Sequence, residues 1–180
     1  ADRIYIKMHN MTVKTEILKK HNIKVDEHCY YVDTEYITYP IPYVNTICFV
    51  DAFVYYYRLG REGQSVGMDK MQKNEQNYDK VLASLLHFYQ QLGRELPCTQ
   101  AKKQYIARLI ARVIAGKFKI MLSFPPSAEK KQQIKQYDKH LKTQYRDIYD
   151  SNINKAVALL RKTQYHTYYL ANMLVRRTYR

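Results

Sequence analysis

The chain has 180 residues, of which 46% are hydrophobic and 26% charged, with only five Gly and five Pro. This composition excludes a wholly disordered or low-complexity chain and fits one folded domain, or one domain with a small appendage. No apolar run reaches the roughly 18 residues of a membrane span. Three cysteines without CxxC spacing favour free thiols in an intracellular protein over a secreted disulfide framework.

The net charge of +14 is concentrated in the second part of the chain. Residues 1–66 carry eight basic and eight acidic side chains, whereas residues 67–180 carry 22 basic and eight acidic ones. A positive field of this size attracts nucleic acid or another polyanion. The 19 Tyr, with plentiful Ile, Lys, Asn and Gln, indicate an AT-rich coding genome, as in viruses, organelles and some microbes.

Residues 1–60 are predicted to form a small, charge-neutral, Tyr-rich α+β part. Residues 3–8 alternate apolar and polar side chains like a short strand, and a short helix is expected after Thr12. Residues 23–41 are rich in Tyr, Val, Ile and Thr, which favours one or two strands. Residues 45–59 are apolar nearly all round, so we expect a helix buried between the strands and the rest of the protein.

Residues 61–77 contain few aliphatic side chains and no clear period, and the charge balance changes there, so they are predicted to be a linker or long loop. Residues 78–180 are predicted to form a basic helical bundle, which makes the fold class mainly α. Short breaks with Pro, Gly or Ser separate its four expected helices, at 78–92, 99–122, 127–149 and from Ser151 or Asn152 to the C-terminus, with Ile153 and Leu174 among the inward side chains of the last.

The expected helix at 99–122 organises the bundle, because it combines the longest aliphatic run with cations at helical spacing. Arg108 and Arg112 are stacked one turn apart, and Gly116 is expected to kink or end the helix. The opposite face is apolar and consists of Tyr105, Ile106, Leu109, Ile110, Val113 and Ile114.

The strongest candidate site is a basic surface interleaved with Tyr, because Lys and Arg neutralise phosphates and Tyr stacks on bases. Acids spaced to pair with these cations are scarce after Glu95, and no zinc-finger or RRM signature is present. We therefore expect backbone binding with a steep salt dependence. The candidate residues are Lys102, Lys103, Tyr105, Arg108, Arg112, Lys117, Lys119, Lys130, Lys131, Lys135, Arg161, Lys162, Arg176, Arg177 and Arg180.

Two short patterns offer a nuclease as the alternative. The segment containing Asp33 and Glu35 locally resembles the first motif of DEDD-type exonucleases, in which an Asp-x-Glu pair on a strand binds two metal ions. The later motifs of that family are missing, which favours an exposed acidic pair. Arg161 and His166 have the Arg-x4-His spacing of HEPN-type ribonucleases, but Lys162 replaces the small polar residue usual there, which favours an ordinary His on an amphipathic helix.

No metal or cofactor is expected. The spacing of the His and Cys residues in the first 50 positions matches no common structural-zinc pattern, and Walker, GxGxxG and GxSxG motifs are absent. The sequence favours a non-enzymatic structural nucleic-acid-binding protein, such as a viral coat or nucleocapsid protein in a virion or inside a cell. Its neutral part would dock to another copy or a neighbouring subunit. An organellar ribosome-type subunit and an adaptor for an acidic protein are further alternatives, and DNA and RNA fit equally well.

Overall fold

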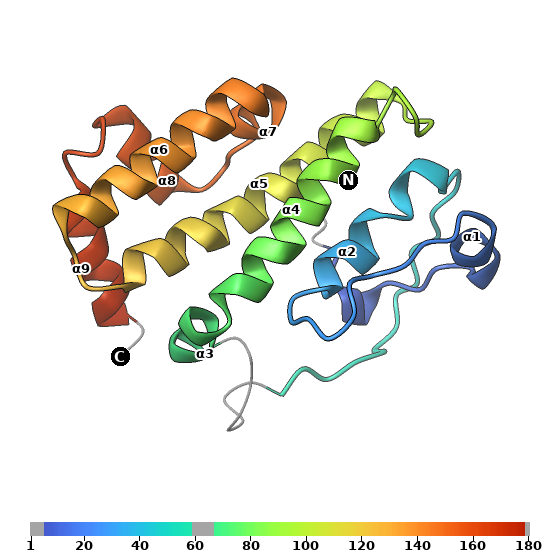
Figure 1. Cartoon of the computed structure of the whole chain (residues 1–180). Coiled ribbons are helices and arrows are strands. Elements are labelled where there is room, and N and C mark those ends of the chain that lie inside the picture. Colours follow the sequence, from blue (N-terminus) through green and yellow to red (C-terminus); the bar gives the residue numbers. More distant parts are fainter. Residues whose placement is uncertain (1–5, 59–66, 179–180) are drawn as a thin grey trace.

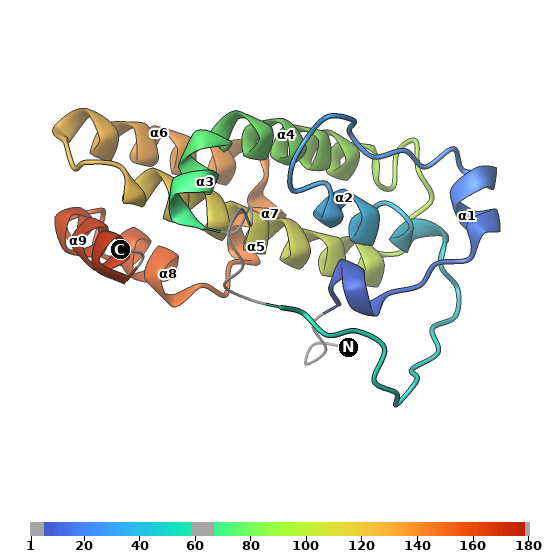
Figure 2. The same cartoon turned by 90° about the horizontal axis from the view of Figure 1, so that it is seen from below.

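The computed structural model describes residues 6–58 and 67–178, and helix is the regular secondary structure throughout these ranges. The mainly α fold class is therefore confirmed. The central element is α5 (Gln100–Ser123), around which the other helices of the bundle pack (Figures 1 and 2). Its partners are α3 (Met68–Lys73), α4 (Glu75–Gln91), α6 (Ala128–Gln144), α7 (Arg146–Asp150) and α9 (Tyr168–Thr178), and α8 (Lys155–Lys162) contacts α9.

Two of the predicted helix starts in the bundle, those of α5 and α6, are confirmed by their caps, whereas α4 begins at Glu75 and α8 at Lys155. The Thr99 side chain accepts a hydrogen bond from the Lys102 amide at the start of α5, and Ser127 accepts one from the Lys130 amide at the start of α6. Each cap satisfies a backbone donor that the first turn leaves unpaired. After α4, Gly93 takes a φ of +80°, which suits glycine at the end of a helix.

Helix α5 is buried on more than the expected apolar face. Ile106, Ile110 and Ile114 are buried as predicted, but so are Ala107 and Ala111, because neighbouring helices cover the small side chains as well. The helix therefore lies inside the bundle rather than on its surface.

Gly116 neither kinks nor ends α5, which runs on to Ser123. The Tyr78 hydroxyl of α4 donates to the Val113 carbonyl of α5 at 2.7 Å and lies directly against Gly116. A side chain at position 116 would collide with this hydroxyl, so the glycine permits the close approach of the two helices.

The last two predicted helices are both divided. The helix expected at 127–149 ends at Gln144 and restarts as α7 after Tyr145. The helix expected after Ser151 becomes α8 and α9, because Gln164 and Tyr165 take positive φ values of 49° and 66°. This change of chain direction buries the Tyr165 side chain. The Tyr165 amide donates a hydrogen bond to the Leu160 carbonyl at 2.8 Å. Ile153 and Leu174, expected to point inward, are exposed.

The prediction of an α+β N-terminal part is wrong. Residues 6–58 contain two short α-helices, α1 (Thr15–Lys20) and α2 (Asp33–Thr38), and two 3₁₀ turns, η1 (Met8–Asn10) and η2 (Ile41–Tyr43). The short helix after Thr12 is confirmed as α1. No strand forms at 23–41 because positive φ values at Asn22, His28 and Tyr31 turn the chain, and α2 then docks on α4 and α5.

The predictions for residues 3–8 and 61–77 fall partly on positions outside the described residues. Residues 3–5 and 61–66 lie outside, whereas residues 6 and 7 are irregular and Met8 begins η1. Residues 67–77 form α3 and the start of α4 rather than a linker, because buried Met68 anchors α3, which packs on α4 and α5.

Residues 45–58, which we call the arm, were expected to form a buried helix, and this prediction is wrong. The arm is irregular and its side chains are exposed, with Phe53 and Tyr56 each 84% exposed. It runs apart from the helices in both views (Figures 1 and 2). Its β-branched and aromatic residues are weak helix formers, so without a surface to cover it a helix has little to stabilise it.

Candidate nucleic-acid interface

Several of the predicted phosphate-binding cations are engaged inside the protein. The Lys102 ammonium donates to the Pro42 carbonyl at 2.8 Å, and the Lys103 ammonium donates to the Leu92 carbonyl at 3.2 Å and lies 5.3 Å from the centre of the Tyr89 ring. These lysines fasten the first turn of α5 to the segments around it. Both are partly buried, so they contribute little to an outer basic surface.

Lys117 belongs to the core. Its side chain is only 7% exposed, and its ammonium lies 2.7 Å from a Glu75 oxygen and 2.6 Å from an Asp79 oxygen. Two carboxylates compensate the buried charge, which would otherwise be costly to desolvate. Since both acids come before Glu95 in the chain, the shortage of acids after that residue concealed the pairing.

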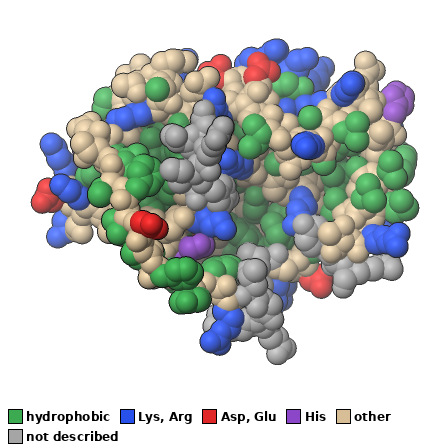
Figure 3. Space-filling model, turned by 180° about the vertical axis from the view of Figure 1, so that it is seen from behind, with side chains coloured by type: hydrophobic (Ala, Val, Ile, Leu, Met, Phe, Trp, Pro, Cys, Tyr) green, Lys and Arg blue, Asp and Glu red, His purple; other side chains and the backbone are tan. Residues whose placement is uncertain are grey.

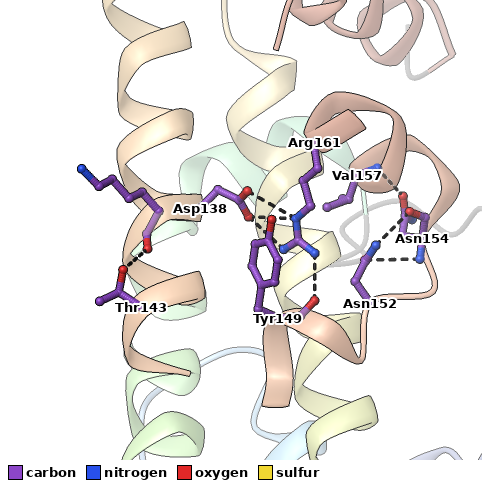
Figure 4. Close-up of polar contacts among 8 residues, drawn as sticks. Asp138, Thr143, Tyr149, Asn152, Asn154, Val157 and Arg161 are labelled. Atoms are coloured by element: carbon purple, nitrogen blue, oxygen red, sulfur yellow. Dashed lines mark hydrogen bonds and ion pairs between the residues drawn. The ribbon is translucent and has the colours of Figure 1, made fainter. Parts of the chain in front are cut away.

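Arg161 of α8 is also committed internally (Figure 4). Its guanidinium donates to both oxygens of Asp138 on α6, at 2.8–3.3 Å, and to the Tyr149 carbonyl at 2.9 Å. The same group lies 3.6 Å from the centre of the Tyr149 ring. This bidentate, stacked arrangement joins α6, α7 and α8.

The remaining candidates on α5 are partly buried. None of Arg108, Arg112 and Lys119 is a free cation, because each has an interaction of its own. Burial raises the pKa of Tyr105, and the Arg112 guanidinium opposes the rise. The face of α5 that was expected to bind an anion is thus integrated into the fold.

The candidates on α6, α8 and α9 lie nearer the surface. Lys130 and Lys131 are partly buried, at 5.1 Å from the centre of the Phe124 ring and 5.8 Å from that of Tyr169, respectively. Lys135, Lys162 and Arg177 are exposed, Arg176 is partly buried, and Arg180 lies outside the described residues. On the face in Figure 3, Lys and Arg side chains are widely spread and Asp and Glu side chains are few.

An open groove of about 540 Å³ runs between α6 and α8, and we call it the α6–α8 groove. Three exposed lysines of α6 line it, namely Lys135, Lys139 and Lys142. The polar amides of Gln132, Gln136 and Gln164 and the rings of Tyr149 and Tyr165 line it too, with Asp138 and Arg161.

Within the described residues no ion pair joins the three lysines of the groove to an acid, although the Lys142 ammonium lies 6.0 Å from the centre of the Tyr149 ring. Asp138, the acid that lines the groove, is already held by Arg161. The buried Tyr165 hydroxyl makes no hydrogen bond of normal geometry within the described residues, and burial together with the Asp138 carboxylate raises its pKa, so it remains a neutral donor. The groove therefore presents three ammonium groups, amides and aromatic rings to an anion.

Lys139 and Lys142 were not among the predicted site residues, although the sequence contained the signal. With Lys135 they occupy positions i, i+4 and i+7 of one helix and so share a face.

The DEDD-like pair does not form a metal site. Asp33 and Glu35 lie on α2 rather than on a strand, so their side chains point in different directions, with Asp33 exposed and Glu35 buried. Glu35 accepts a hydrogen bond from the Asp26 amide at 2.8 Å. No group of three His, Cys, Asp or Glu side chains among the described residues is arranged to hold a metal ion.

The HEPN-like pair is likewise not brought together. The Arg161 guanidinium is directed at Asp138, whereas His166 is exposed in the turn between α8 and α9. Within the described residues the two side chains share no hydrogen bond, so the paired chemistry of that motif is not assembled in one copy.

Comparison of the chain with protein-family models, curated proteins and solved structures gave no match. In the part of the chain that the structure describes, every helix is too short or too polar to cross a membrane. The functional inference therefore depends on the chemistry of the surface.

Proposed function

We propose that the protein is a non-enzymatic structural nucleic-acid-binding protein of the viral coat or nucleocapsid type. In this proposal the α6–α8 groove binds the phosphate backbone of DNA or RNA. The observation that supports it is the row of three exposed, uncompensated lysines beside amide and tyrosine side chains. The site of action would be a virion or the interior of a cell.

The row is long enough to contact more than one phosphate. From Lys135 to Lys142 the helix advances about 10 Å, because each residue contributes about 1.5 Å. Successive phosphates of one strand of a duplex advance by about 3.4 Å along the axis and also wind around it. The glutamine amides of the groove donate to phosphate oxygens.

The Arg161–Asp138 pair gives the groove a fixed width. It connects α6 to α8, so the lysines of α6 are held near Tyr149 of α7 and near Gln164 and Tyr165 in the turn after α8 before any ligand arrives. A preformed site avoids part of the ordering cost of binding. Arg161 thus acts as a positioning residue and not as a phosphate ligand.

A coat protein requires a second surface that contacts its copies, and the exposed apolar arm is suited to that purpose. An organellar ribosome-type subunit would use the same basic chemistry, and an adaptor would present it to an acidic protein. A nuclease has less support, because neither Asp33 with Glu35 nor Arg161 with His166 is assembled into a site.

The proposal is tested by binding to labelled duplex DNA, duplex RNA and a single strand across a salt series. The test variant replaces Lys135, Lys139 and Lys142 by Gln, and a matched control replaces the exposed Lys14, Lys19 and Lys20 near or in α1. Loss of three phosphate contacts should reduce the slope of log affinity against log salt by about 2 to 3. The control should keep the slope of the parent.

Three results would overturn the proposal. The first is a groove variant that binds like the parent. The second is retention of an acidic protein, unaffected by nuclease, with no affinity for nucleic acid, which would favour the adaptor. The third is reproducible cleavage of nucleic acid that is lost in His166→Ala or Asp33→Ala, which would favour an enzyme.

A further inference from the structure

Exposed apolar side chains concentrate in two places, and the first is the arm. Its only charged residues are Asp51 and Arg58, so it offers no basic surface to a polyanion. The exposed large side chains are Ile47, Phe49, Val50, Phe53, Val54, Tyr55, Tyr56 and Tyr57. A fully buried aromatic side chain covers about 150–250 Å², so the arm exposes on the order of 800 Å², which is the share of one partner in a standard protein interface.

The arm is also long enough to reach another molecule. An extended chain of this length spans up to about 45 Å, and since both of its ends belong to the body, it projects at most about half of that distance. The main chain of residues 45–58 makes no hydrogen bond to the main chain of any other described residue, and no regular secondary structure forms within the segment. Stacking of His9 on Tyr55 and Tyr57, at 4.9 Å and 5.1 Å between ring centres, holds one end of the segment.

The second apolar surface is the outer face of α9. Tyr168 and Asn172 are buried, and the Asn172 amide donates to the Leu122 and Phe124 carbonyls at the end of α5. The opposite side of the same helix is nevertheless apolar, and its large side chains are 51–56% exposed, namely Tyr169, Leu170, Met173 and Leu174.

An apolar stripe on the outer face of a helix is typical of a helix that is covered on that face as well as on its inner one. Positions i, i+1, i+4 and i+5 lie on one face of a helix, so the four side chains form one surface. Arg177 lies on the same face, one turn after Met173, and is exposed. An aromatic partner would cover the apolar stripe and offer ring faces to the guanidinium.

The arm of the same copy does not cover this stripe. The arm starts at the end of the molecule that carries α1 and α2 and turns back toward its middle, whereas α9 lies at the opposite end in both views (Figures 1 and 2). We infer that the arm of one copy binds the outer face of α9 in a second copy. The aromatic side chains of the arm that do not stack on His9, namely Phe49, Phe53 and Tyr56, then meet an apolar stripe that contains a cation.

The contact joins two different surfaces, so it repeats from one copy to the next. Each copy keeps a free arm or a free α9 face after one contact, which generates rings or open chains rather than a closed pair. The inference deepens the proposed coat-type function by naming the surface that receives the arm. It requires no nucleic acid, so the two proposals can fail separately.

The test uses one variant of each surface in the full chain. Phe53→Asp with Tyr56→Asp disables the arm, and Leu170→Asp with Met173→Asp disables the α9 face, all at exposed positions. Circular dichroism checks that both variants remain folded. Sedimentation velocity without nucleic acid then measures association of the parent, each variant and their equimolar mixture.

We expect the parent to associate with increasing concentration and each variant alone to remain monomeric. The mixture should form a one-to-one heterodimer and nothing larger, because it offers one intact arm and one intact face. A monomeric parent, a mixture that stays monomeric, or an α9-face variant that associates like the parent would each overturn the inference; the last result would indicate arm-to-arm pairing. The Lys135, Lys139 and Lys142 variant should associate like the parent.

Discussion

Residues 67–178 bury their apolar side chains against one another, whereas residues 45–58 expose theirs to solvent. In the bundle, Leu85, Ile106 and Ile110 are fully buried between α4 and α5. In the arm, the equally apolar Phe53 and Tyr56 contact little of the body. An apolar sequence pattern therefore predicts that a surface becomes buried. It does not tell whether the residues that cover it belong to the same chain or to another molecule.

The largest loss of stability in the bundle should come from breaking the ion pair between Arg161 and Asp138. Asp138→Asn should destabilise the protein by about 3–5 kcal/mol, because the almost fully buried Arg161 guanidinium loses its counter-charge. Arg161→Lys should recover little relative to Arg161→Met, since lysine lacks the planar fork that reaches both oxygens. Urea unfolding measures these values, and a loss below about 1 kcal/mol for Asp138→Asn would contradict the assigned role.

A smaller loss is expected at the second internal ion pair. Lys117→Met should cost about 2 kcal/mol, less than a fully buried pair, because Glu75 and Asp79 both reach solvent. The double variant Lys117→Met with Glu75→Gln should be more stable than Lys117→Met alone, since it removes the repulsion between the remaining acids. Thermal and urea unfolding of the three proteins tests this order, and equal stability of the single and double variants would contradict it.

The docking of the N-terminal part should depend on pH through Glu35. Burial, the largest cause, and the nearby Asp26 carboxylate raise the pKa of this carboxyl above its ordinary value, while the Asp26 amide opposes the rise. The folded protein therefore binds the proton more tightly than the unfolded chain, and the stability contributed at low pH is lost as pH rises through the raised pKa.

Glu35→Gln removes this titration and can still accept the hydrogen bond of the Asp26 amide. The stability of the variant relative to the parent should therefore increase from about pH 4 upward and level off above the raised pKa. Unfolding by urea between pH 4 and 8 measures the difference. A difference that stays constant, or one that falls with pH, would contradict the expected coupling.

The sequence was sufficient for α4, α5 and the start of α6 because the signals of these helices are local. Apolar residues at helical spacing and the caps at Thr99 and Ser127 located α5 and α6. The break between α8 and α9 was missed because the positive φ of Tyr165 results from burial of its ring, which depends on distant residues. The strands expected at 23–41 failed for a similar reason, since docking of α2 outweighed a weak β preference.

The candidate site was predictable only in part. Lys135, predicted to bind nucleic acid, is exposed, and the i+4 and i+7 spacing could have added the exposed Lys139 and Lys142 to the prediction. Arg161 was predicted to bind phosphate, but Asp138 lies 23 residues away, and no local pattern indicates that the two meet. The distribution of charged residues along the sequence predicts which part of the chain is positive. The ion pairs of the folded chain decide which of those cations are left to bind a ligand.

The smallest change in stability should come from substitutions in the arm. This measurement contrasts the arm with the bundle most directly. Phe53→Asp with Tyr56→Asp should change the unfolding free energy of the dilute protein by less than about 0.5 kcal/mol, because both side chains are already in water. As a matched control, Phe118→Ala removes one buried aromatic side chain of α5 and should cost about 3–5 kcal/mol. If the arm variant is destabilised as strongly as the core variant, the arm packs on its own body in solution and the contrast between the regions is lost.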